Sequence, residues 1–153
     1  MKAVIALGSK CLIWIGVVLL IACTREGPMD DKFLQEFRQK FDAIKQGDSL
    51  KIDAIPAGDW TELFVFGPYT PEEEITSNMR PRNASPLKLE RISERDDINL
   101  LVFVSTTDVK LSVAVPRAIA DFKLPKGMRS LTREKAVFQK SGKSELVVQE
   151  SAR

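Results

Sequence analysis

Few side chains in this 153-residue sequence could perform chemistry, and their types are restricted. There is no histidine, and the two cysteines are Cys11 and Cys23. Ser–His–Asp triads, Cys–His nucleophiles and zinc sites that use histidine are therefore excluded by residue type. Any catalysis would need carboxylates, Lys, Ser or Tyr. Among the nucleophiles the thiol of Cys23 has the most informative setting in the sequence.

Cys23 ends a nearly unbroken apolar run, and Lys2 and Lys10 precede that run. A basic start, an apolar segment of about 7–15 residues and small residues at the cleavage point are typical of a secretory signal. A membrane-spanning helix needs about 20 apolar residues, and this run is shorter. We therefore expect residues 1–22 to be a signal peptide.

The last four residues of the run, Leu20-Ile21-Ala22-Cys23, resemble the bacterial lipoprotein signal box. The resemblance implies cleavage before Cys23, a diacylglyceryl thioether on its sulfur and a fatty-acyl chain such as palmitate on its freed amine. One acyl chain binds a membrane marginally, whereas two or more anchor a protein stably. The alternative is an uncleaved N-terminal anchor in which Cys23 is an ordinary buried thiol.

Thr24 follows the expected lipidation site. In enteric bacteria an Asp at this place tends to retain lipoproteins at the inner membrane, so the resemblance implies a periplasm-facing protein of the cell envelope, on the outer rather than the inner membrane. Residues 23–29 would form the lipidated Cys and a short tether. Six extended residues reach at most about 20 Å, so the folded part would lie close to the bilayer.

Residues 30–149 have the length of one domain, and we expect residues 150–153 to be a tail. Lys2 and Lys10 would leave with the signal. The chain has 23 basic and 21 acidic residues, so the mature protein would have equal numbers of the two. This balance argues against a nucleic-acid binder and against a polybasic membrane-surface patch. With one cysteine left, the mature monomer can form no internal disulfide. Nothing in the sequence indicates a metal or a cofactor.

A helix is expected from Asp30 to about Gln46, because apolar residues recur there at helical spacing. The stripe consists of Phe33, Leu34, Phe37, Phe41 and Ile44. The aspartates suit the positive end of the helix dipole, and Gly47 is a natural stop. The stripe could fit a partner groove, but packing on the protein's own sheet is the favoured interpretation.

The stretch from Trp60 to Phe66 is β-branched and aromatic, which predicts a central strand. Gly67-Pro68 should end it. Thr70-Pro71-x-Glu73 has the pattern of a capping box, which predicts a short helix through Ile75 and Met79.

Trp60, the strand after it and the turn Phe66-Gly67-Pro68-Tyr69-Thr70 resemble a group of small proteobacterial lipoproteins and secreted proteins. The likeness extends loosely through Ile98–Val104 and Pro116–Phe122, or roughly half of the mature chain. It implies a shared fold and carries over no catalytic residues.

Most of the remaining sequence predicts strands separated by short polar turns. The expected strands are Leu87–Ile92, Ile98–Ser105, Lys110–Val115, Ala118–Phe122, Glu134–Lys140 and Glu145–Gln149, with a possible edge strand at Ser49–Ile55. Short connections favour an antiparallel meander with the helices on one face. The predicted fold class is therefore α+β, an antiparallel sheet packed with an N-terminal helix and a second short helix.

Four residues of the body are candidates for an interaction site. Trp60 and Tyr69 are types that anchor interfaces and sugar platforms, although packing is favoured for both. Asp121 lies between Ala120 and Phe122, and if it faces inward it needs a partner such as Arg117. A structural ion pair is the favoured interpretation of that couple.

Two charge clusters have simple structural interpretations. Glu72-Glu73-Glu74 fits the negative start of a helix better than a metal or acid–base site. A basic run, consisting of Lys123, Lys126, Arg129, Arg133 and Lys135, could touch lipid headgroups or an acidic polymer. A solvated surface is favoured for this run.

These observations favour a lipid-anchored, non-enzymatic binding module whose partner is an envelope protein, peptidoglycan or an enzyme that it inhibits. One alternative is a cell-wall glycan hydrolase that uses two carboxylates about 5–10 Å apart in a cleft. Another is a purely structural envelope component. The sequence does not indicate the oligomeric state.

Overall fold

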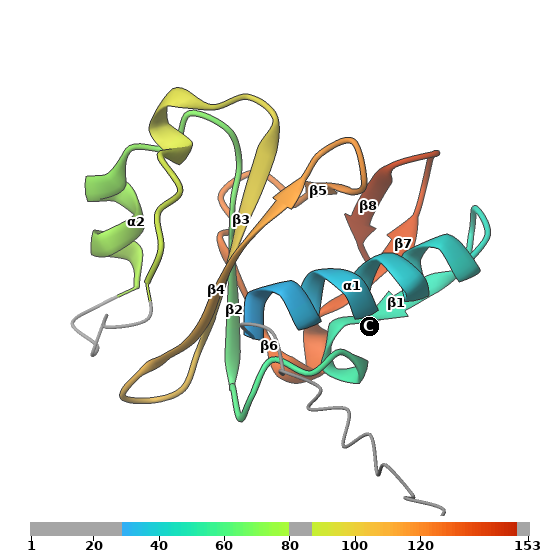
Figure 1. Ribbon diagram of the computed structural model, residues 1–153, viewed down its shortest axis with the longest axis horizontal. Helices are drawn as coiled ribbons and strands as arrows, with labels where there is room; N and C mark the ends of the chain where they lie inside the picture. The colour runs from blue at the N-terminus through green and yellow to red at the C-terminus, as the bar shows by residue number, and fades with distance from the viewer. Residues whose placement is uncertain (1–28, 80–86, 150–153) are drawn as a thin grey trace, which may run out of the picture.

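The computed structural model describes residues 29–79 and 87–149, which form two helices, eight strands and three short 3₁₀ turns (Figure 1). The helices are α1 (Met29–Ala43) and α2 (Glu72–Asn78), and the 3₁₀ turns are η1 (Ile52–Ala54), η2 (Ile92–Glu94) and η3 (Arg133–Lys135). The strands are β1 (Ser49–Lys51), β2 (Glu62–Phe66), β3 (Ile98–Val104), β4 (Val109–Pro116), β5 (Asp121–Lys123), β6 (Ser130–Thr132), β7 (Val137–Lys140) and β8 (Glu145–Val148). The α+β class with an N-terminal helix and a second short helix is confirmed. Within the described ranges no helix has the length and apolar character needed to cross a bilayer.

Four antiparallel strands in the order β4-β3-β2-β6 form what we call the central sheet. The strand predicted around Trp60–Phe66 is β2, and it lies between β3 and β6 as a central strand should. β2, β3 and β4 follow one another along the chain and across the sheet, so this part is the expected meander. The expected strand Leu87–Ile92 is absent, because the backbone at Glu90 and Arg91 is left-handed (φ 52° and 53°).

The second sheet has the order β1-β7-β8-β5. β7 and β8 form the expected hairpin, but β5 pairs with β8 in parallel rather than with its neighbour β4. The strand expected over Ala118–Phe122 is shortened to β5, because a turn on the carbonyl of Pro116 takes up the preceding residues. The strands are thus divided between two sheets, and the meander does not extend from β4 to β5.

Helix α1 lies against the strands (Figure 1). Its phenylalanine stripe packs into a core that both sheets share. Phe33, Phe37 and Phe41 are almost fully buried. The ring of Phe33 lies 5.2 Å from that of Phe103 in β3, and the ring of Phe37 lies 5.7 Å from that of Phe122 in β5. The stripe therefore joins the central sheet to the second one, as expected for packing on the protein's own strands.

A second apolar cluster covers the opposite face of the central sheet. Alternate residues of β2 and β3, including Phe66 and Val102, meet Ile75 of α2 and Met79 just after it there. The expected capping box is wrong, because the Thr70 hydroxyl donates to the Gly67 carbonyl (2.7 Å) and Pro71 occupies the N-cap position. Leu87 and Leu89 pack on this cluster without joining a strand, so their apolar spacing reflects burial alone.

Candidate functional site

Trp60 is a core residue, and the structure excludes it from the accessible surface. Its side chain is 1% exposed and packs edge-on against Phe103, with ring centroids 5.2 Å apart. The guanidinium of Arg133 lies over the indole at 5.3 Å and also donates to the Trp60 carbonyl. Packing, the favoured interpretation of this residue, is what the structure shows.

Tyr69, by contrast, is 60% exposed and is held in an unusual backbone conformation. Its φ is 59°, in the left-handed region that costs a residue with a side chain about 1–2 kcal/mol. The amide of Tyr69 donates to the carbonyls of Ile92 (3.0 Å) and Arg95 (3.2 Å). These bonds fix the turn and present the phenol ring to solvent.

Arg117 and Asp121 form the ion pair that their spacing suggested. Two parallel hydrogen bonds of 2.9 Å join the guanidinium to both carboxylate oxygens. Lys123 also contacts Asp121 (2.7 Å), and the buried amide of Asn99 donates to it (3.4 Å). Arg117 first of all, together with Lys123 and Asn99, holds the pKa of Asp121 well below its usual range.

The ion pair and Tyr69 belong to one surface at the end of the central sheet. The backbone amide of Arg117 donates to the Asp97 carbonyl, and its guanidinium donates to the Asp96 carbonyl, both at 2.8 Å. Asp121 raises the pKa of Arg117 most, and Asp96 and Tyr69 also contribute. The same segment carries Arg95, whose guanidinium makes two bonds of 2.8 and 2.7 Å to Asp97.

We call this region the Tyr69 surface; it consists of Tyr69, Arg91, Arg95 and Arg117 with their acidic partners. The three described residues other than glycine that have positive φ are Tyr69, Glu90 and Arg91; two of them belong to this surface, and Glu90 directly precedes Arg91. Beside them is an open hollow of about 480 Å³ lined by Glu90, Arg91, Glu94 and Arg95. Backbone strain tends to persist where surrounding structure enforces it, and it concentrates at functional sites.

The structure thus brings together Tyr69, Arg117 and Asp121 of the predicted residues and leaves Trp60 apart. Arg91 and Arg95 were missed by the sequence analysis, since they lie in a charged segment with no distinctive spacing. Only the hydrogen bonds from Tyr69 to this segment reveal their place. Cys23 lies outside the described residues.

The acidic run Glu72-Glu73-Glu74 has the structural role that the sequence favoured. Glu72, Glu73 and Glu74 lie in the first turn of α2, as expected for a negative helix start, and Glu74 pairs with Arg129 at 3.0 Å. Within residues 29–79 and 87–149 no three acidic or cysteine side chains are grouped so that they could hold a metal ion.

Asp121→Asn should destabilise the fold by about 2 kcal/mol at pH 7, since a hydrogen bond to a charged group contributes about 1.5–3 kcal/mol. The pKa of Asp121 is lower in the folded than in the unfolded chain, so its contribution is complete at neutral pH and is lost as pH falls below about 4. Urea unfolding from neutral to acidic pH should therefore show a difference between wild type and variant that shrinks on acidification. Asp53→Asn, at an exposed carboxylate of η1, is the matched control. A difference that stays constant with pH would contradict an origin in the Asp121 charge.

Comparisons of the chain with protein-family models, with curated proteins and with solved structures find no match.

Proposed function

We propose that the chain is a lipid-anchored protein of the bacterial cell envelope, held at the membrane through Cys23, and that its folded part is a non-enzymatic module that binds an envelope protein. The lipoprotein signal box at Leu20–Cys23 supports the anchor. The observation that carries the binding role is the Tyr69 surface. Tyr and Arg are enriched at the energetic centres of protein interfaces.

The Tyr69 surface has the rigidity that a binding site needs. The hydrogen bonds of the Tyr69 amide fix the backbone that carries its ring, and the paired bonds of Arg95 and Arg117 hold these two side chains before any partner arrives. Little conformational entropy would then be lost on binding, which favours affinity. Each Arg of this surface is already paired with a carboxylate. A partner would therefore be bound through contact area and hydrogen bonds rather than through attraction to a net positive charge.

The hydrolase alternative receives less support. A general acid needs a carboxyl whose pKa is raised toward neutrality. Wherever a shift is resolved in the described carboxylates, the pKa is lowered, as at Asp30, Asp97, Asp108, Asp121 and Glu134. The binding proposal is therefore preferred to the catalytic one.

Site-specific photo-cross-linking in intact envelopes tests the binding role. A benzophenone amino acid at position 69 of the full chain should give a discrete adduct, whereas the same group at Lys51 in β1 should give none. Tyr69→Ala should weaken binding of the captured partner by about 2 kcal/mol or more, roughly 30-fold, as expected of an interface hot spot.

The adduct also separates the alternatives. An adduct that disappears on muramidase digestion would identify peptidoglycan rather than a protein as the partner. Equal labelling from positions 69 and 51, or none from either, would contradict the binding role and favour a purely structural component.

A further inference from the structure

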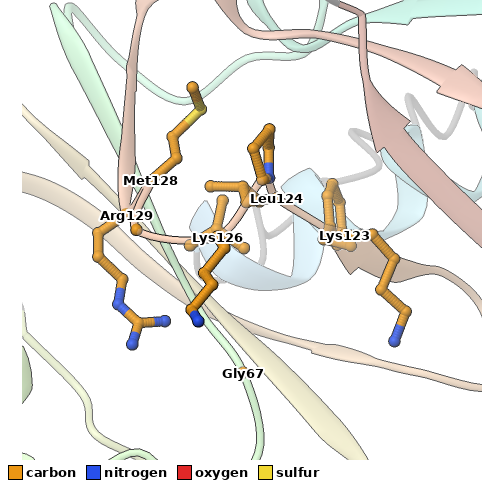
Figure 2. A pocket seen from close by; sticks show the side chains of 10 residues that line it. Gly67, Lys123, Leu124, Lys126, Met128 and Arg129 are labelled. Carbon is orange, nitrogen blue, oxygen red and sulfur yellow. The ribbon is translucent and has the colours of Figure 1, made fainter.

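A hollow of about 290 Å³ opens between β2 and the loop that joins β5 to β6. Val65 and Phe122, both nearly buried, supply apolar parts of its lining. Figure 2 shows the side chains of Lys123, Lys126 and Arg129 extending to the same side of the loop. We call these three cations, together with the loop 124–129, the basic hollow.

The cations of the basic hollow differ in how firmly they are engaged. No acidic side chain in residues 29–79 or 87–149 pairs with Lys126. Lys123 pairs with Asp121, whose carboxylate would keep both bonds from Arg117 if Lys123 turned away. Arg129 pairs with Glu74, and both side chains are substantially exposed (51% and 36%), so this pair is weakly held. All three cations can therefore turn to an anionic ligand without leaving a buried charge unpaired.

The same loop carries apolar side chains beside its cations. Met128 is 36% exposed and is one of three large exposed apolar or aromatic residues in the described ranges, with Met29 and Tyr69. Leu124 and Pro125 are half-buried in the wall of the hollow. Cations with an apolar residue between them suit the boundary between lipid headgroups and acyl chains.

We infer that the basic hollow binds the phosphate headgroup of an anionic phospholipid in the membrane that holds the anchor. The inference rests on the proposed lipidation of Cys23, because a short tether keeps the loop near headgroups at high effective concentration. The near-zero net charge of the mature chain argues against an extended polybasic surface, but not against a local group of three cations. Distant charges are screened beyond about 8–10 Å in physiological salt, so the local group of cations decides the attraction.

Headgroup binding would give the domain one orientation on the bilayer. The anchor alone leaves the domain free to turn on its tether, whereas a second contact fixes which surface faces the periplasm. The basic hollow adjoins the Tyr69 surface, because Asp121 pairs with Lys123 of the one and with Arg117 of the other.

Hydrogen exchange of the lipidated full chain on vesicles tests this inference. The amides of loop 124–129 should exchange more slowly on vesicles of phosphatidylcholine mixed with phosphatidylglycerol than on phosphatidylcholine alone. Lys126→Gln should weaken the loop's binding about fivefold, the effect expected for one basic residue near an anionic surface. The difference should vanish near 1 M salt, where the screening length falls to about 3 Å.

The control is Lys45→Gln, which removes an exposed lysine just after α1 that does not line the hollow. It should leave the phosphatidylglycerol effect unchanged. Equal exchange on both kinds of vesicle, or equal effects of the two substitutions, would overturn the inference while leaving the anchor intact. Failure of the chain to stay on either vesicle would instead contradict the anchor, and the inference with it.

Discussion

Cys23→Ala should remove all acyl mass from the protein. The signal box implies that the Cys23 sulfur accepts the diacylglyceryl group, and Ala offers no nucleophile in its place. Intact mass of the protein extracted from its native membrane would show, for the wild type, a chain that begins at Cys23 and carries lipid. The variant should carry no lipid, because it lacks the sulfur that accepts it.

Cys11→Ala is the matched control for this substitution, since it changes the other cysteine of the chain. It should alter neither the acyl mass nor the cleavage point. A wild-type protein found at full length and without lipid would contradict the lipoprotein proposal. The N-terminal segment would then be an uncleaved anchor, and Lys2 and Lys10 would remain in the charge balance.

Phe103→Ala should lower the free energy of unfolding by about 3–5 kcal/mol, the range for removing a fully buried aromatic ring. The ring lies between Phe33 of α1 and Trp60, with centroids 5.2 Å from each, so its loss leaves a cavity where helix and central sheet meet. A domain of this size is stable by about 5–15 kcal/mol, so the change removes a large share of the total. Urea unfolding followed by circular dichroism measures it.

Two further variants keep the Phe103 experiment interpretable. Thr106→Ala, in the exposed turn after β3, should change stability by less than about 0.5 kcal/mol. Phe103→Leu fills part of the cavity and should fold with a smaller loss if the Ala variant does not fold at all. A loss at Phe103→Ala as small as that at Thr106→Ala would show that α1 is not held through this contact.

The features that the sequence predicted correctly are those whose cause is local. Helix α1 follows from a phenylalanine at every fourth position, which places three rings on one stripe whatever that stripe packs against. The hairpins β3–β4 and β7–β8 follow from apolar runs on either side of a short polar turn. The ion pair between Arg117 and Asp121 could also be predicted from the sequence, because the two residues are only four positions apart.

The features that the sequence missed depend on contacts between distant segments or on turn hydrogen bonds that replace an expected helix cap. The parallel pairing of β5 with β8 joins strands far apart in the chain, and β5 itself is too short to be recognised from its own residues. Thr70 and Glu73 have the spacing of a capping box, yet the nearby Gly67 carbonyl takes the Thr70 hydroxyl. At such places a tertiary or turn contact replaces the structure that the local sequence favours.

The sequence by itself determined the residue types available for chemistry and the α+β class, because these depend on composition and on short-range periodicity. The lipid attachment at Cys23 stays a prediction from the resemblance of Leu20–Cys23 to a signal box. Only the tertiary structure decided that Trp60 is buried while Tyr69 is exposed, since both are aromatic residues beside the same strand. It also decided that the Tyr69 amide donates to the Arg95 carbonyl, and that Lys123, Lys126 and Arg129 extend to the same side of the loop 124–129. Such surfaces combine residues from separate loops. The packing of the two sheets and α1 decides which of these residues come together.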